Sequence, residues 1–211
     1  MARTPYRLTD EAAEKITSKI HKDFRHNRLA LFDEMNVLQT RKHIKKLYKS
    51  VDKNIKKEFS KILELLYEEL YNEAKAFGFD GDIQDLDEGW IEEFFDEYNP
   101  TTKYVFSNEL DRKESRLFES IVADIESKIQ SYKTAERLLN NQVKHNSILL
   151  EDSVTKIAYK DAGVKKVKWI AEDDYKTCSV CRDLDQAIFL LEEVPFKPHP
   201  NCRCYIIPVK E

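Results

Sequence analysis

Apolar residues recur at helical spacing over most of the first 163 positions of the chain. Between Arg41 and Phe77 they follow one another mostly at steps of three, four or seven residues, which places them on one face of an amphipathic helix. This set contains Ile44, Tyr48, Val51, Ile55, Phe59, Ile62, Leu66, Leu70 and Phe77. Gly78 and Gly81 follow it directly, and glycine is common where a helix ends. The pattern therefore predicts one long helix that ends near residue 78.

The same spacing predicts further helices on both sides of this segment. Thr9, with Asp10 and another acidic residue behind it, is typical of a helix start, because a side-chain oxygen accepts hydrogen bonds from free N–H groups and acids favour the positive end of the helix dipole. A short acidic and aromatic helix is expected over residues 87–98. Helical spacing continues over 110–139, and a further helix is expected over 147–161.

Beyond Gly163 the pattern changes from helical to extended. Residues 164–172 alternate and carry Val and Trp, residues 187–191 are short and apolar, and residues 202–209 are rich in β-branched side chains with a proline near the end. These three segments predict three short strands.

We therefore expect a mainly α protein built from two parts. An extended multi-helix region over residues 1–163 precedes a small β-rich module of the α+β type over residues 164–211. So small a module buries little apolar surface and usually needs a metal, disulfides or a partner to hold together. No apolar run approaches the roughly 18 residues that span a bilayer, and the first residues lack the apolar stretch of a signal peptide, so no membrane contact is expected.

Composition and charge narrow the class of protein further. Of the 211 residues 41 % are hydrophobic and 35 % are charged, with only four glycines, which argues against a disordered or collagen-like chain. The net charge of −4 conceals a split of +8 over residues 1–63, −14 over residues 64–126 and +2 over residues 127–211. Such asymmetry is common in components of larger assemblies and in proteins that contact nucleic acid.

A basic stripe on the long predicted helix is the candidate contact with nucleic acid. Its lysines recur on one face and could bind phosphates without reading sequence. They are Lys42, Lys45, Lys49, Lys53 and Lys56. An ordinary solvated face, opposite the apolar one, is the alternative interpretation and stays open.

All four cysteines lie in the small module. Cys178 and Cys181 form a C-x2-C pair in the loop after the first strand, and Cys202 and Cys204 form C-x-C at the start of the last one. Two clustered pairs separated by 20 residues suit a structural zinc ion held by four ligands. The four-cysteine set is preferred, and the alternative set is Cys178, Cys181, His199 and Cys202, which leaves Cys204 spare.

Other uses of these cysteines remain open. Disulfides between the two pairs, free buried thiols and a thioredoxin-like redox pair are the alternatives to a metal. Three basic residues would offset the negative charge of a tetrathiolate centre, namely Lys176, Arg182 and Arg203.

The order of motifs in the module resembles a known family. Trp169 is followed by D-x-x-x-T-C-x-x-C ending at Cys181, by L-D-x-x-x-F over 184–189, by P-x-x-P-H-P-N-C-R-C over 195–204 and by a closing I-P-V. This order resembles the C-terminal signature of the phage head morphogenesis proteins, the Mu protein F-like minor head proteins. The resemblance covers about residues 150–209. Family members often carry glycine after the L-D pair, where this chain has Gln186.

The resemblance implies a minor virion protein that binds the portal vertex and acts in head morphogenesis and in DNA packaging or ejection. It implies the portal protein as partner, with the major capsid protein, other inner head proteins and packaged DNA as further candidates. It also implies assembly in the host cytoplasm, no small-molecule substrate and no catalysis. The residues themselves agree on the last point, because the chain contains no HExxH, P-loop, GxSxG or Rossmann motif. The alternative function is a zinc-containing nucleic-acid-binding protein that places its basic helix on the phosphate backbone.

Overall fold

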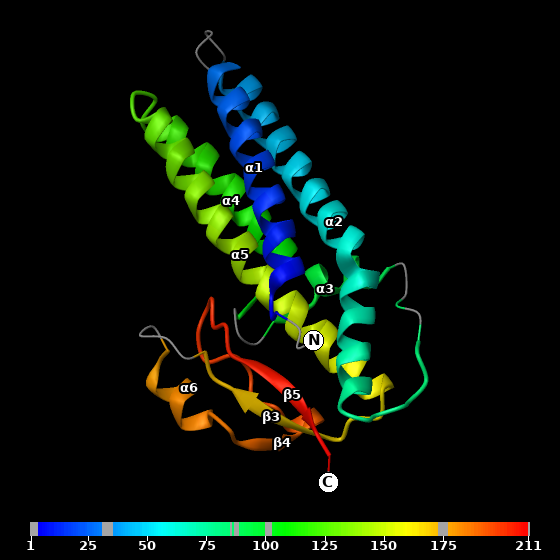
Figure 1. Cartoon of the computed structure of the whole chain (residues 1–211). Helices are drawn as coiled ribbons and strands as arrows, with labels where there is room; N and C mark the ends of the chain where they lie inside the picture. The colour runs from blue at the N-terminus through cyan, green and yellow to red at the C-terminus, as the bar shows by residue number, and fades with distance from the viewer. Residues whose placement is uncertain are drawn as a thin grey trace.

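The computed structural model describes residues 4–30, 36–84, 86, 89–99, 103–172 and 177–210. Long helices form an elongated bundle in which α1 packs on α2 and α5, and α2 packs on α4 and α5 (Figure 1). These helices are α1 (Arg7–Ala30), α2 (Val37–Ala76), α4 (Phe106–Ala123) and α5 (Lys128–Asp161). Within the described residues no helix is long and apolar enough to cross a membrane. The expected mainly α fold with a small β-rich module is confirmed.

Shorter elements complete the fold. Beside the bundle lie α3 (Trp90–Asp96) and a two-stranded ribbon of β1 (Tyr98–Asn99) and β2 (Tyr104–Val105). The C-terminal module contains β3 (Lys166–Ile170), α6 (Ser179–Leu184), β4 (Ile188–Leu190), the 3-10 turn η1 (Leu191–Glu193) and β5 (Tyr205–Val209). Its sheet has the order β4-β3-β5 with antiparallel neighbours, so the three predicted strands are confirmed.

The apolar face predicted for α2 lies in the core of the bundle. Ile44, Val51, Ile55 and Phe59 are fully buried there. The helix begins at Val37, a few residues before the apolar pattern becomes visible, because the side chains of Asn36 and Gln39 each bond the other's backbone N–H at 3.0 Å. The bundle helices therefore bury their apolar faces against one another rather than leaving them for a partner.

Two of the predicted helix boundaries are wrong for tertiary and local reasons. α1 begins at Arg7, so Thr9 does not cap it, and its hydroxyl instead donates to the buried Glu151 carboxylate at 2.8 Å. The helical spacing over 110–139 is interrupted after Ala123, because the Asp124 carboxylate accepts the backbone N–H groups of the next turn at 3.0 and 3.2 Å.

The gap expected between residues 139 and 147 is absent, since α5 runs unbroken over Lys128–Asp161. This stretch is polar, and the sequence pattern gave no reason to make it helical. Its side chains are nevertheless covered by neighbouring elements, as Gln142, His145 and Asn146 are all buried. Burial by neighbouring elements therefore keeps this segment helical despite its weak intrinsic helix propensity.

Glycines end two of the helices as expected. Gly78 and Gly163 follow α2 and α5 with φ of +87° and +83°, a left-handed conformation that favours glycine. Gly81 serves another purpose, because a Cβ at this position would overlap the carbonyl oxygen of Asp161. The loop after α2 therefore lies directly on the end of α5.

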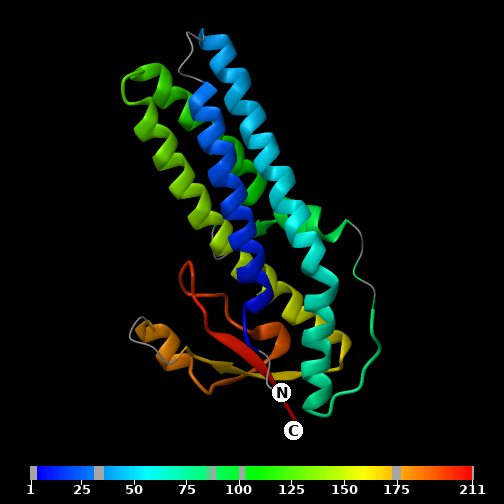
Figure 2. The same ribbon diagram turned by 45° about the horizontal axis from the view of Figure 1, so that its top comes forward.

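The sheet of the module lies across one end of the bundle (Figures 1 and 2). Burial alternates along β3 and β5, so that Val167, Trp169 and Ile206 face the helices. These residues belong to the same buried cluster as the bundle core. The boundary near residue 163 thus coincides with the end of α5, but a continuous core crosses it.

One prediction concerns the turn between α6 and β4. Gln186 has φ +62° there while its N–H donates to the Trp169 carbonyl at 2.9 Å. The left-handed region strains any residue with a Cβ, so Gln186→Gly should relieve backbone strain. Glycine also increases the conformational entropy of the unfolded chain, and the net result should be a rise of about 0.5 kcal/mol in the free energy of unfolding. Urea denaturation would measure it. Gln186→Ala is the control, since it keeps the Cβ, and equal stability of the two variants would contradict the prediction.

Candidate metal centre

Cys178 and Cys181 lie at the start of the short helix α6. Cys178 caps the helix, and its sulfur accepts a hydrogen bond from the Cys181 N–H at 3.4 Å. Cys181 lies one turn further along and is buried. Residues three apart on a helix share one side, so both sulfurs face the same region. The sequence predicted a loop at this point, whereas residues 179–184 are helical.

Cys202 and Cys204 lie directly before β5, and both are buried. In a regular strand their α-carbons would stand about 6.6 Å apart, at about 3.3 Å per residue, so the chain must bend for both sulfurs to reach one ion. Residues 202–204 lie outside the regular strand. The chain also bends directly before them, at Asn201, which has φ +62°, and there the Cys202 N–H donates to the His199 carbonyl at 3.3 Å. Asparagine tolerates this backbone conformation better than most residues.

Five donor side chains come together in two overlapping groups. Cys178, Cys181 and His199 form one group, and Cys181, Cys202 and Cys204 form the other. Within each group the ligand atoms lie within 4.8 Å of one another, and the Cys181 and Cys202 sulfurs are 3.4 Å apart. Sulfurs around a tetrahedral zinc at about 2.3 Å stand about 3.8 Å apart, so this spacing is close to that of a metal site. The cluster could hold a metal ion, and Cys181 is common to both groups.

His199 presents the correct nitrogen to this cluster. Its Nε2 lies 4.0 Å from the Cys181 sulfur, while its Nδ1 lies 3.0 Å from the carbonyl oxygen of Pro200. Because a carbonyl only accepts, the Nδ1 carries the proton and the lone pair of a neutral ring is on Nε2. Metal-binding histidines are usually held in this way. The geometry therefore places His199 beside Cys178 and Cys181, while neither of the two four-ligand sets lies as a whole within 4.8 Å.

The pKa values of the cysteine thiols are shifted in different directions. Burial raises the pKa of Cys181 to about 12. The hydrogen bond between Cys202 and Cys204 raises the pKa of Cys202 and lowers the pKa of Cys204 to about 5. This hydrogen bond therefore favours a proton on Cys202 and negative charge on Cys204. A metal ion would replace such shared protons, because thiolates are the ligands it binds.

Of the three basic residues expected around the cysteines, Lys176 lies outside the described residues. Arg182 is exposed on α6. Arg203 turns away to the α1 residue Asp10, whose carboxylate it binds through two hydrogen bonds of 3.1 and 2.8 Å. Its role in the fold is therefore to join the module to α1.

Lys197, which no sequence motif singled out, is a largely buried cation close to the second pair. The hydrogen bond between the two thiols has the largest effect on their pKa values, and the charge of Lys197 opposes the rise in the pKa of Cys202 and adds to the lowering of the pKa of Cys204; its side chain is only 8 % exposed. Its ammonium donates to the Tyr6 hydroxyl at 2.8 Å and lies 3.4 Å from Asp152. The Tyr6 hydroxyl in turn lies 2.7 Å from the Cys204 carbonyl oxygen. A buried network thus connects α1, α5 and the cysteine pair.

His145 on α5 supports the other side of the bend. Its Nδ1 accepts the Asn201 N–H at 3.0 Å, which requires a neutral ring. Burial, together with the nearby His199, lowers the pKa of His145 to about 4. The bend that presents Cys202 is therefore held by an uncharged histidine of the bundle.

Two cavities flank the cysteine pairs. One of about 590 Å³ is lined by Cys181, Cys202 and His199 together with Asp10 and Glu14 from α1, and it gives solvent access to the donors.

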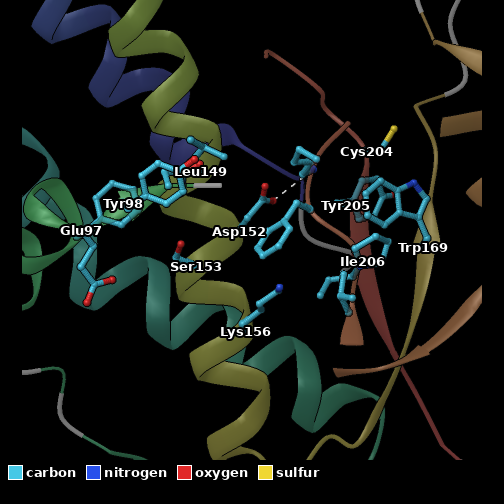
Figure 3. Close-up of a pocket in the computed structure, with 16 residues that line it drawn as sticks. Glu97, Tyr98, Leu149, Asp152, Ser153, Lys156, Trp169, Cys204, Tyr205 and Ile206 are labelled. Atoms are coloured by element: carbon cyan, nitrogen blue, oxygen red, sulfur yellow. Dashed lines mark ion pairs between the residues drawn. The ribbon is translucent and has the colours of Figure 1, made fainter. Parts of the chain in front are cut away.

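The other, of about 220 Å³, lies between α5, β1 and the module (Figure 3). There Asp152 and Lys156 extend from α5 towards Trp169 and Ile206, while the Cys204 sulfur points away from Asp152. Only the larger cavity therefore opens onto the ligand atoms.

The basic stripe is on the surface of α2, far along the bundle from the module. Its first four lysines are exposed, and Lys56 is half-buried beside Asp52 at 3.8 Å. Lys45 lies near the α4 residue Glu114 and lowers its pKa, although burial raises that pKa by more. The stripe is thus a solvent-facing surface whose charge is partly balanced by acids. The stripe and the cysteine cluster share no residue.

Comparisons with protein families, with curated proteins and with solved structures find no match to this chain. What the cluster can do therefore follows from its own donors, their spacing and their burial.

The shared position of Cys181 generates a prediction about ligands. Cys181→Ser should abolish tight binding of cobalt(II), a spectroscopic probe of thiolate ligation, because it removes a donor from both groups. His199→Ala and Cys204→Ser identify the fourth ligand, since only loss of a true ligand should reduce the thiolate-to-cobalt absorption band. Ser179→Ala on the exposed side of α6 is the control and should bind as the unaltered chain does. Normal cobalt binding by Cys181→Ser would contradict the assignment.

The neutral His145 generates a prediction about pH. Because its pKa is lowered in the folded protein, the unfolded chain takes up a proton first as the pH falls below about 6.5. Its contribution to stability is therefore complete at neutral pH and is lost as the pH falls towards 4. The asparagine of His145→Asn keeps an acceptor but does not titrate. When the pH falls from about 7 to about 4.5, the free energy of unfolding of this variant should therefore fall by about 2 kcal/mol less than that of the unaltered chain. Urea denaturation at both pH values would show identical losses if His145 were not responsible.

Proposed function

We propose that this chain is a phage minor head protein, bound at or near the portal vertex, that acts in head morphogenesis and in DNA packaging or ejection. The observation that carries the proposal is the cysteine module. The C-x2-C and H-P-N-C-R-C segments, on which the resemblance depends, are the segments that meet in one cluster. Their conformation, with a bend at Asn201 and a cap at Cys178, gives a physical reason for the spacing of the motif.

We propose zinc as the ion of this cluster, in a structural role. Thiolate and imidazole ligands select zinc among the common divalent ions, and a closed set of four protein ligands is typical of structural sites. Three of the four cysteines are buried. The ion would join α6 to the segment before β5, in a module that has only a small sheet of its own.

The far end of the bundle is the candidate docking surface for the portal protein. Exposed apolar side chains gather at the two helix connections there, although the helix faces themselves are buried. Leu29, Val37 and Leu38 lie at the α1–α2 connection, and Val122 and Ile125 lie at the α4–α5 connection. Figure 1 places both connections at the end opposite the sheet. An exposed apolar cluster of this kind is typical of a protein interface.

DNA binding through the stripe is the second candidate function, favoured by the exposure of Lys42, Lys45, Lys49 and Lys53 along one face of α2. Such contacts would be independent of base sequence and sensitive to salt. This function would leave the apolar end of the bundle without a role.

The zinc proposal predicts both content and stability. Protein purified under reducing conditions should contain about one zinc per chain by elemental analysis. Removal of the ion with a chelator should lower the thermal midpoint of the whole chain, because the module shares a core with the bundle. A chain that stays free of metal, keeps reduced thiols and melts at an unchanged temperature would contradict the proposal.

The docking proposal predicts which surface variants fail. Leu38→Asp and Ile125→Asp, made in the full chain, should lose association with portal-containing particles while circular dichroism stays unchanged, because a charge would be buried at the interface. Leu65→Asp is the control, since Leu65 is exposed in the middle of α2.

If nucleic acid is the partner instead, Lys45→Glu with Lys49→Glu should abolish a salt-sensitive DNA complex, and particle association should not depend on the apolar end. Lys133→Glu on the exposed surface of α5 is the matched charge control. Heads that assemble without this protein and still package and deliver DNA normally would contradict the minor head protein proposal.

A further inference from the structure

β4 is an edge strand whose outer side is open. On its inner side the Ala187 carbonyl accepts the Trp169 N–H, and the Leu191 N–H donates to the Lys165 carbonyl, each at 2.9 Å. Since backbone groups alternate along a strand, those of Ile188 and Leu190 point away from β3. In both views β4 lies at the rim of the molecule (Figures 1 and 2), and no described residue pairs with its outer side.

The opposite edge of the same sheet is closed. The carbonyl of Cys204, directly before β5, accepts a hydrogen bond from the Tyr6 hydroxyl at 2.7 Å, and that of Ile206 within β5 accepts one from the Tyr159 hydroxyl at 3.3 Å. Pro208 in the same strand has no N–H to offer. The bundle therefore blocks strand pairing at β5, and of the two edges of this sheet, as far as the described residues show, β4 is the open one.

The side chains at the open edge are apolar and face solvent. Ile188 is 55 % exposed and Leu190 is 45 % exposed, while Phe189 between them turns to the other face. An added strand is recognised through its main chain and through alternate side chains, and β4 offers both. Exposed apolar residues on an unpaired edge are otherwise a liability that proteins avoid.

The charges at the two ends of β4 indicate the kind of strand that fits. Asp183 and Asp185 precede it, Glu192 and Glu193 follow it, and all four are exposed, although Glu192 lies 3.6 Å from Lys160. The lysines opposite Ile188 and Leu190 lie on β3, on the inner side of β4. A second copy of β4, paired antiparallel about Phe189, would place acid opposite acid at both ends, which disfavours self-association. A segment with lysine or arginine at its ends meets opposite charge instead.

We propose that β4 binds an extended segment of a partner protein by strand addition, and that this segment carries alternating apolar residues flanked by basic ones. The site is separate from the metal centre and from the apolar end of the bundle, so it does not depend on the proposed function.

Leu190→Pro tests the proposal with little disturbance of the fold. Leu190 has φ −64°, the value that proline requires, and its N–H points outwards, so the change removes only a donor that an added strand would use. The probe is a fluorescein-labelled peptide in which valine alternates with threonine between two pairs of lysines. Fluorescence anisotropy should show saturable binding to the full chain and binding about tenfold weaker to Leu190→Pro, since one hydrogen bond is lost and the ring obstructs approach.

Two further measurements test whether binding depends on the Leu190 N–H and on the charge of the peptide. Leu190→Ala retains the N–H and should weaken binding less than Leu190→Pro, while a peptide flanked by glutamates should bind more weakly than the lysine peptide at low salt. Equal binding by Leu190→Pro and the unaltered chain, or no binding to either, would overturn the proposal. Dimers of the unaltered chain that Leu190→Pro abolishes in sedimentation velocity would also overturn it, because the occupant would then be a second copy.

Discussion

The hydroxyl of Tyr6 lies where α1, α5 and the cysteine module meet, and the position of the metal centre depends on this contact. It reaches the Cys204 carbonyl at 2.7 Å and Asp152 at 3.0 Å, and it accepts from Lys197 at 2.8 Å. The backbone N–H of Tyr6 also donates to the buried Glu151 at 2.6 Å. Buried polar groups cost free energy when they lose their partners, so these contacts favour this placement of the module on the bundle. Burial raises the pKa of Tyr6, which keeps the hydroxyl protonated and able to donate.

The features that could be predicted from the sequence are those that depend on residues close together in the chain. Features that depend on contacts between distant residues could not be predicted. The apolar face of α2 and the three strands of the module were predictable, because local periodicity determines them. The polar stretch around His145 was not, since its helical state depends on neighbours that bury it. The network around Tyr6 could not be predicted either, because the residues it bonds are 191 and 198 positions away in Lys197 and Cys204.

The candidate metal centre also has features that the sequence could predict and features that it could not. Cysteine spacing alone indicated which side chains should meet, and the structure places them in two overlapping groups that share Cys181. Spacing could not show that Nδ1 of His199 is occupied by Pro200, nor that Asn201 makes the bend that positions Cys202. Gln186 is instructive here, because its φ of +62° is a conformation that favours glycine, and its residue type gave no sign of it. Cysteine spacing therefore indicates ligand chemistry, whereas the backbone geometry depends on contacts across the module.

The continuous core between bundle and module has a thermodynamic consequence. If residues from α1 to β5 unfold together, an ion bound at one end stabilises every part of the chain by the same amount, about 2.7 kcal/mol when its free concentration is a hundred times its dissociation constant. Metal supply in the cell would in that way set the fraction of chains that are folded, and chains made during scarcity would be the first exposed to proteases.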